Sequence, residues 1–316
     1  CGTFFMARFV VIGGGAAGFF AAIAAAEAGH RVTLLEATSK LLAKVLISGG
    51  GRCNVTHSCF DARELVKAYP RGGKALRGPF ARFQPTDTVH WFAERGVETK
   101  TESDGRMFPV TDDSSTIADC LIRSATESGV EILTDHRVLS VVAGESGCEL
   151  EIQDQAKIEG DAVLLATGGT KAGYELARQL GHTIVPPVPS LFTFNVNDPR
   201  LTDLQGVSAT DVECELQVGD SKHRQRGPLL VTHWGVSGPA VLKLSAWAAR
   251  ELHGSKYQAM LRVNWLPTRN REEIRAELRR QRETNAKRTL ESSCPFSLPK
   301  RLWKSLVDYA VGAPVR

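Results

Sequence analysis

The sequence predicts an α/β protein that begins with a Rossmann-like domain, and two stretches of the chain support this prediction. Residues 8–36 read as a strand, a helix and a second strand, with the glycine pattern GxGxxG at the first turn. Residues 161–166, DAVLLA, form an almost continuous apolar run, which is typical of a parallel strand buried on both faces. Parallel strands connected by helices build a sheet that helices cover.

Each glycine of the first unit meets a steric need. Gly13 permits the tight turn after the strand, Gly15 lets the backbone approach a pyrophosphate, and Gly18 lets the helix pack close to the strand. The anion would bind to free N–H groups at the helix start, around Ala16 and Ala17.

Glu36 ends the second strand, eighteen residues after Gly18. A carboxylate at this position accepts hydrogen bonds from both ribose hydroxyls and repels a 2′-phosphate. The unit therefore predicts a bound adenine dinucleotide, and by itself it leaves NAD and FAD open. Residues 9–26 carry no charge, but three consecutive glycines and the prompt second strand argue against a membrane span.

Composition sets the broad class of the protein. A length of 316 residues suggests roughly two domains, and the net charge of +4 is too small to indicate a partner. The seven cysteines are scattered and show neither zinc spacing nor a CxxC pair. We therefore expect reduced thiols, no metal site and a cytoplasmic location.

The remaining segments alternate between helical and extended patterns. Ile117, Leu121 and Ala125 recur at helical spacing after Ser114, which predicts a helix with one buried stripe. Short extended segments from residue 191 onward predict a second domain of antiparallel strands. Further helices are expected at residues 61–69, 86–95, 173–180, 236–252, 271–288 and 298–311, and further strands at 98–100, 130–133, 137–142, 149–152, 157–160 and 229–232.

Residues 48–54, SGGGRCN, are the second informative stretch. The three glycines after Ser48 predict a loop whose backbone can lie against a flat ligand, with hydrogen-bond donors on either side. A flexible surface turn is the alternative, but the loop closely follows the dinucleotide unit, which favours a ligand. Arg52 would also favour the thiolate form of its neighbour Cys53.

Several motifs together resemble the HI0933-like flavoproteins, a family of bacterial NAD(P)/FAD-dependent oxidoreductases. The resemblance runs from Val10 to about Ser245, and the second motif is the most specific. It implies FAD rather than NAD at the first site. The motifs are GGGAAG at 13–18 with Glu36, KVLISGGGRCN at 44–54, GRMFPV at 105–110, LLATGG at 164–169 and LLVTHWGVSGPAVLKLS at 229–245.

The resemblance also implies the domain organisation. We expect a Rossmann-like FAD-binding domain of the GR2 type at 1–188, an inserted mainly-β domain at 189–265 and a small helical subdomain at 266–316. Family members return to the FAD domain through a C-terminal glycine-rich segment. The sequence up to Arg316 contains no such segment, so we expect a truncated family member.

The resemblance assigns roles to individual residues. The backbone around Val138 would hold the adenine, and residues 166–169 would form a second contact with FAD. Catalytic roles are expected for Arg52, Asn54 and Arg106. The expected cofactor-binding residues are Gly13, Gly15, Ala16, Ala17, Gly18, Glu36, Ala37, Lys44, Ser48, Gly49, Gly50, Gly51, Arg52, Cys53, Asn54, Val138, Ala166, Thr167, Gly168 and Gly169.

The expected reaction is hydride transfer between flavin N5 and a small organic substrate, with NAD(P)H as a candidate reductant. Reduction of an activated C=C bond and oxidation of an amine both stay open, as does the oligomeric state. Alternatives are an inactive truncated flavoprotein fragment and a flavin-dependent RNA-associated protein that uses the basic helix at 271–288. A nucleic-acid partner is not favoured, because acids at 272, 273, 277 and 283 are interleaved with the arginines.

Overall fold

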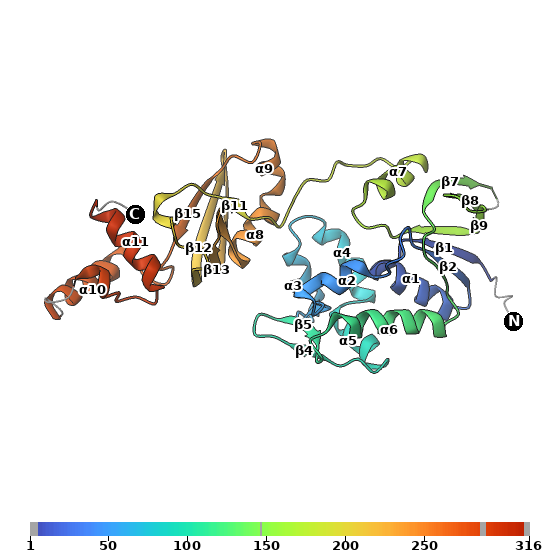
Figure 1. Cartoon of the computed structure of the whole chain (residues 1–316), viewed down its shortest axis with the longest axis horizontal. Coiled ribbons are helices and arrows are strands. Elements are labelled where there is room, and N and C mark those ends of the chain that lie inside the picture. Colours follow the sequence, from blue (N-terminus) through green and yellow to red (C-terminus); the bar gives the residue numbers. More distant parts are fainter. Residues whose placement is uncertain (1–5, 146, 285–288, 313–316) are drawn as a thin grey trace. The chain divides into compact units, whose positions relative to one another are not determined.

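Four parallel strands form the centre of the first part of the chain (Figure 1). The computed structural model describes residues 6–145, 147–284 and 289–312, and the chain divides into two units, Cys1–Val185 and Pro186–Arg316. In the first unit the strand order is β10-β1-β2-β6, and each neighbouring pair is parallel, which confirms the predicted Rossmann-like sheet. The strands are β1 (Arg8–Ile12), β2 (Arg31–Leu35), β6 (Glu131–Leu133) and β10 (Ala162–Leu165).

Apolar layers cover both faces of this sheet, because successive side chains of a strand point to opposite sides. Val11 and Leu34 belong to a core with the predicted buried residues Ile117 and Leu121. Val10 belongs to the core of the opposite face. The first layer is built by α1 (Ala16–Glu27) and α6 (Ser114–Glu127), the second by the antiparallel strands β7 (Val138–Gly144), β8 (Gly147–Ile152) and β9 (Ile158–Gly160) with α7 (Lys171–Gln179).

A long excursion between β2 and β6 carries a small antiparallel sheet with the order β3-β5-β4. One of its helices, α4, was not predicted, because Gly72, Gly73, Gly78 and Pro79 indicate a turn. The elements are α2 (Ala43–Ile47), η1 (Ser48–Gly50), β3 (Thr56–His57), α3 (Ala62–Leu65), η2 (Val66–Ala68), α4 (Gly73–Arg82), α5 (Pro85–Ala93), β4 (Thr99–Thr101) and β5 (Arg106–Pro109).

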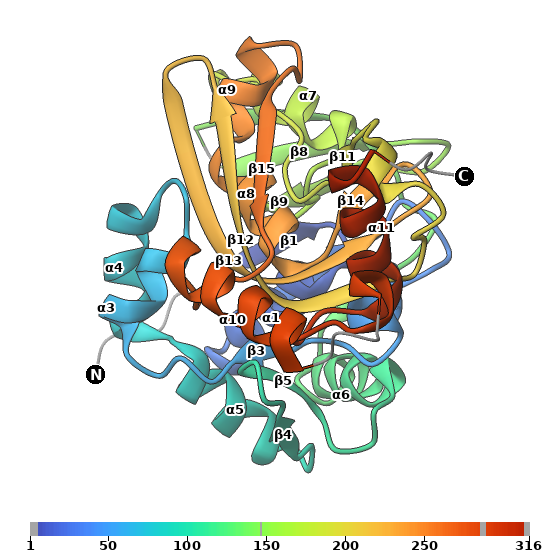
Figure 2. The same cartoon turned by 90° about the vertical axis from the view of Figure 1, so that its left-hand side faces the viewer.

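The second unit contains the predicted antiparallel sheet, in the order β11-β14-β13-β12-β15 (Figure 2). The helix expected at 236–252 is wrong in its bounds, since residues 235–237 form a strand and the helix breaks at Ala248. The elements are β11 (Phe194–Asn195), η3 (Pro199–Leu201), β12 (Ser208–Val218), β13 (Ser221–Val231), β14 (Gly235–Ser237), α8 (Pro239–Trp247), α9 (Ala249–Gly254) and β15 (Met260–Asn264).

Helices follow the last strand, and they pack on a small core of their own that includes Ile274, Leu278, Phe296 and Trp303. They are α10 (Arg271–Thr284), η4 (Leu290–Ser292) and α11 (Lys300–Ala310). The last four residues of the helix predicted at 271–288 lie outside the described residues. The division into three domains with ends at 188 and 265 stays a prediction. Among the described residues, no helix combines the length and the apolar character that crossing a bilayer requires.

Candidate functional site

The turn between β1 and α1 is sterically restricted to glycine at two of the three glycine positions of its GxGxxG pattern. A Cβ atom on Gly13, whose φ is +118°, would lie 2.5 Å from the carbonyl oxygen of Ala166. A Cβ atom on Gly18 would lie 1.9 Å from the carbonyl oxygen of Gly13. At Gly15 the same atom would meet nothing within 4 Å. The open space beside Gly15 is therefore where a ligand can approach the backbone.

The start of α1 can bind an anion. Gly15 is the N-cap, and no side chain caps the helix there. Ala16 and Ala17 are exposed, and the first turn carries no acidic residue. The N–H groups of this turn are thus available to a phosphate, and the positive end of the helix dipole favours it.

Glu36 is held beside this turn. Its Oε2 accepts a hydrogen bond from the Gly14 N–H at 2.9 Å, and its Oε1 accepts from the N–H and the hydroxyl of Thr38 at 3.0 and 2.9 Å. The N–H of His136 donates to the carbonyl oxygen of Glu36 at 2.9 Å, which brings the chain leading to Val138 alongside. The Val138 side chain is buried, so only its backbone could contact an adenine. Ala37, next in sequence, is half-buried.

The carboxyl end of β10 meets the same turn. Ala166 lies against Gly13. A Cβ atom on Gly168 would lie 3.7 Å from Nζ of Lys44, so this ammonium group is close to the turn at 167–169. Gly168 and Gly169 are exposed. The structure therefore gathers these predicted residues at the carboxyl ends of parallel strands, where α/β sheets bind ligands.

The glycine loop adopts a left-handed backbone over three residues. The φ angles of Gly49, Gly50 and Gly51 are +56°, +71° and +85°. The N–H groups of Gly51 and Cys53 both donate to the carbonyl oxygen of Ser48 at 3.0 Å. Cβ atoms on Gly50 or Gly51 would meet nothing within 4 Å. Their open faces can accept a flat ligand.

Two apolar side chains beside this loop were missed by the sequence analysis. Leu46 and Ile47, at the end of α2, are 40% and 75% exposed. Exposed apolar side chains next to an open glycine backbone suit an aromatic ring system. The signal in the sequence is weak, because an apolar residue after Lys44 also fits ordinary packing.

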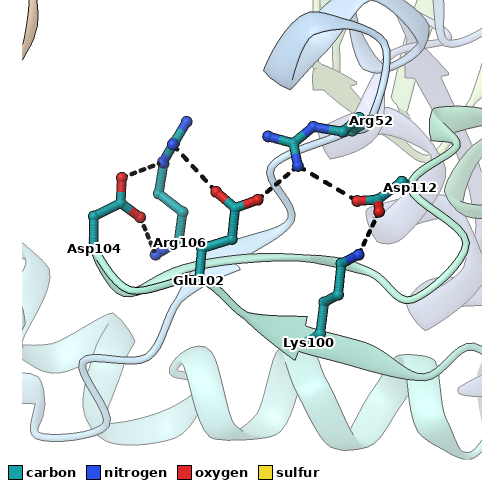
Figure 3. Close-up of polar contacts among 6 residues, drawn as sticks. All are labelled: Arg52, Lys100, Glu102, Asp104, Arg106 and Asp112. Carbon is teal, nitrogen blue, oxygen red and sulfur yellow. Dashed lines mark hydrogen bonds and ion pairs between the residues drawn. The ribbon is translucent and has the colours of Figure 1, made fainter.

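The predicted catalytic arginines lie on either side of one carboxylate (Figure 3). Nη1 of Arg52 is 2.6 Å from Oε1 of Glu102, and Nη2 of Arg106 is 3.3 Å from Oε2. Both guanidinium groups lie over the buried ring of Phe108, at 4.1 and 5.4 Å from its centre. Among the described residues, Nη2 of Arg52 and Nη1 of Arg106 make no hydrogen bond.

Further charges extend this group, which we call the Glu102 cluster: Arg52, Lys100, Glu102, Asp104, Arg106 and Asp112. Asp112 accepts from Lys100 and lies 3.4 Å from Arg52, and the hydrogen bond from Lys100 lowers the Asp112 pKa most. The hydrogen bond from the Arg106 backbone lowers the pKa of Asp104. Sequence reasoning missed Glu102, although its place four residues before Arg106 was a faint signal.

Asn54 and Cys53 are held by the protein rather than presented freely. With its nitrogen facing the carbonyl oxygens of Thr56 and Met107, the exposed Asn54 amide donates to them at 2.9 and 3.3 Å. The prediction that Arg52 favours the thiolate form of Cys53 is wrong. The side chain is buried, and burial raises the pKa of its thiol. In the described parts of the chain, no group of three or more His, Cys, Asp or Glu residues could hold a metal ion.

The family model described as "HI0933-like protein Rossmann domain" matches residues 7–285. The chain belongs to the HI0933-like family. The ribosomal RNA dihydrouridine synthase of Escherichia coli (strain K12) is 30% identical over 312 residues, 95% of this chain and 74% of that protein. A 3-dehydro-bile acid delta(4,6)-reductase from Clostridium scindens is 29% identical over 314 residues, 96% of this chain and 75% of that protein. The ribosomal RNA dihydrouridine synthase of Haemophilus influenzae is 29% identical over 316 residues, 96% of this chain and 74% of that protein.

Membership of the HI0933-like family confirms the predicted resemblance and gives the enzyme class. The protein is an FAD-dependent oxidoreductase with a Rossmann-type FAD-binding domain. Its residues fit the cofactor: the open space at Gly15, the uncapped start of α1, the Glu36 carboxylate and the ammonium group of Lys44 match a pyrophosphate and a ribose.

Proposed function

We propose that the protein reduces a carbon–carbon double bond that is conjugated with a carbonyl group. The supporting observation is that three relatives, each aligned over 95% or more of this chain, carry names that denote this bond change. Dihydrouridine is uridine with two hydrogens added to the C=C bond beside a ring carbonyl. A delta(4,6)-reductase of a 3-dehydro compound adds hydrogens to a C=C bond conjugated with a ketone.

The reaction consumes one NAD(P)H and one proton for each double bond. A hydride equivalent adds to the carbon β to the carbonyl group, a proton adds to the α carbon, and NAD(P)⁺ is released. When bound, FAD supplies the ring that takes two electrons from NAD(P)H and gives them to the substrate. The residues that would hold it are the glycine turn at 13–18, Glu36, Lys44, the loop at 48–54 and the turn at 166–169.

The chain's own contribution is positioning and charge stabilisation. Negative charge develops on the carbonyl oxygen while the hydride adds, and a fixed N–H donor stabilises it. Arg52 and Arg106 each keep a terminal nitrogen free of protein hydrogen bonds among the described residues, while Glu102 fixes both side chains. We therefore assign these two arginines to the substrate carbonyl, and Asn54 to the shape of the loop through its bonds to Thr56 and Met107.

The two substrate classes named among the relatives call for a direct comparison. Two of the three names refer to ribosomal RNA, so a uridine of RNA is the first substrate to test. A steroid-like dienone is the second, because one name refers to a bile acid. Amine oxidation, the other reaction compatible with the family resemblance, has no counterpart among these names.

An anaerobic half-reaction experiment tests the proposal. Protein loaded with FAD is mixed with NADPH, NADH or an amine, and the visible absorption of the flavin is followed. Reduced protein is then mixed with transcribed ribosomal RNA or with a 3-oxo-4,6-diene steroid. We expect bleaching by a nicotinamide and recovery of the absorption with a conjugated C=C substrate. Bleaching by the amine without recovery by either C=C compound would contradict the proposal.

A variant pair links the reaction to the site. Arg106→Gln should slow the recovery step with little change in bleaching by the nicotinamide, because the carbonyl oxygen loses a donor. Arg63→Gln is the matched control, since this arginine is exposed and pairs only with the neighbouring Asp61 among the described residues.

A further inference from the structure

Helix α10 carries a row of arginines along one side. Arg271, Arg275, Arg279 and Arg282 follow each other at intervals of four, four and three residues, which places them on one stripe of a helix. With a rise of about 1.5 Å per residue, the row is roughly 16 Å long. All four side chains are exposed. We call this row the arginine stripe.

The helix that presents the stripe is anchored. Ile274 and Leu278 pack against a core that contains Phe296, Trp303 and Val307. At the N-terminus, the Asn270 side chain accepts from the Glu273 N–H, and the Glu273 carboxylate accepts from the Asn270 N–H, both at 2.9 Å. This reciprocal cap fixes the first turn.

The acids interleaved with the arginines do not neutralise the stripe. Glu273 is used in the cap, and Glu277 pairs with Arg280 at 2.8 Å on another side of the helix. Glu272 and Glu283 lie at helical spacing from Arg275 and Arg279, but neither forms an ion pair within the described residues. Among the described residues, none of the four stripe arginines forms an ion pair. In contrast, Lys304 on α11 pairs with both Glu291 and Asp308. Two of the four acids that made a nucleic-acid partner unfavoured in the sequence are therefore engaged away from the stripe.

We propose that the arginine stripe binds the phosphate backbone of an RNA substrate. Guanidinium groups match phosphate oxygens with two parallel hydrogen bonds, and a row of unpaired cations matches the repeated charge of a polynucleotide. The choice of RNA over other polyanions rests on the proposed function. The stripe supplies affinity and register on the backbone, while base recognition belongs to other residues.

The test measures binding apart from turnover. A fluorescein-labelled single-stranded RNA is titrated with the full chain, without reductant, over a series of salt concentrations. Two variants carry all four substitutions, one Arg→Gln and one Arg→Lys. Gln and Lys have helix propensities close to that of Arg, so the helix should persist, and circular dichroism checks this.

A control variant removes a similar charge elsewhere in the same unit. Arg224→Gln, Arg226→Gln and Arg262→Gln together neutralise three arginines that already pair with Glu215 or Asp211. Four lost phosphate contacts at about 0.7 each lower the slope of log K against log salt by about 3. We expect this smaller slope, with an affinity loss of roughly 10- to 100-fold, for the fourfold Arg→Gln variant and for neither the Arg→Lys variant nor the control.

Each outcome is decisive. A Gln variant that keeps the wild-type slope, or a control variant that loses as much affinity, overturns the proposal. Strong binding of anionic lipid vesicles through the stripe, without RNA binding, overturns it as well. Because flavin recovery with the steroid dienone does not involve the stripe, normal recovery together with lost RNA binding supports the proposal. If the flavin absorption failed to recover while the Gln variant still showed weaker RNA binding and a smaller salt slope, the result would count against the proposed function alone.

Discussion

Nη1 of Arg52 lies 2.6 Å from Oε1 of Glu102, and this contact ties the glycine loop to the turn between β4 and β5. The two residues are fifty positions apart in sequence. Glu102 also holds Arg106, so a single carboxylate aligns both arginines over Phe108. The loop therefore owes its shape to charge pairing as well as to its glycines.

Replacing this carboxylate by an amide should loosen the loop. In Glu102→Gln the paired negative charge is lost, and charge-assisted hydrogen bonds to both arginines weaken. We expect faster amide hydrogen exchange over residues 48–54 and FAD affinity reduced roughly fivefold. Hydrogen exchange by mass spectrometry and flavin titration measure the two effects. Glu98→Gln is the control, because Glu98 is exposed and forms no ion pair within the described residues, and an equal effect there would refute the idea.

The order of β1, α1, β2 and β10 was predictable because its signals are local. The steric needs of Gly13 and Gly18 lie in the backbone of one turn, and apolar runs identify parallel strands. The stripe of Ile117, Leu121 and Ala125 was predicted for the same reason. The cap of this helix was not predicted: the side chain of Asp113 accepts from the Ser115 N–H.

Features that depend on distant segments escaped the sequence. Val236 lies in a strand rather than a helix because it pairs with Val231 and Phe194. The Cys53 pKa is raised because burial of the thiol outweighs its hydrogen bond with Ser48. The role of Glu102 as the centre of a charged cluster could not be predicted, because folding of the segment between β2 and β6 brings it to Arg52, fifty positions away.

The buried thiol of Cys214 should make the free energy of unfolding depend on pH in the alkaline range. This thiol on β12 is fully buried, and burial raises its pKa to about 11. The folded pKa thus exceeds the unfolded value, so the contribution is complete below about pH 8.5 and is lost as pH rises toward the folded pKa. We expect the free energy of unfolding to fall by about 1.4 kcal/mol per pH unit from this group between those limits.

Denaturant unfolding from pH 8 upward, compared between the wild type and Cys214→Ala, isolates this thiol from titrating lysines and tyrosines. The difference between the two proteins should shrink as pH rises. A constant difference would show that the thiol does not titrate differently on unfolding.

Glu36 should both stabilise the turn after β1 and accept hydrogen bonds from the ribose of the cofactor. Glu36→Gln keeps a single acceptor oxygen, for either the Gly14 or the Thr38 N–H group, and it removes the charge that strengthens hydrogen bonds to ribose hydroxyls. We expect ADP, measured by calorimetry, to bind about tenfold more weakly, and the melting temperature to fall because one of the two N–H groups loses its acceptor. Glu36→Ala should also lower the melting temperature, because the buried Gly14 N–H loses its partner. If the Gln variant bound ADP as tightly as the wild type, the Glu36 carboxylate would not contact the ribose.

Gly15 separates a structural requirement from a binding requirement. A methyl group at this position meets no protein atom within 4 Å, and the φ of Gly15 is −92°, which alanine adopts freely. Gly15→Ala should therefore fold with a melting temperature close to that of the wild type. The methyl group nevertheless occupies the space through which a pyrophosphate reaches the start of α1, so the variant should retain little FAD.

Gly18→Ala should fail differently, by unfolding, because its Cβ would lie 1.9 Å from the Gly13 oxygen. Gly78→Ala, in an open position on α4, should keep both fold and flavin. If Gly15→Ala were purified with a full complement of FAD, the pyrophosphate would have to bind elsewhere.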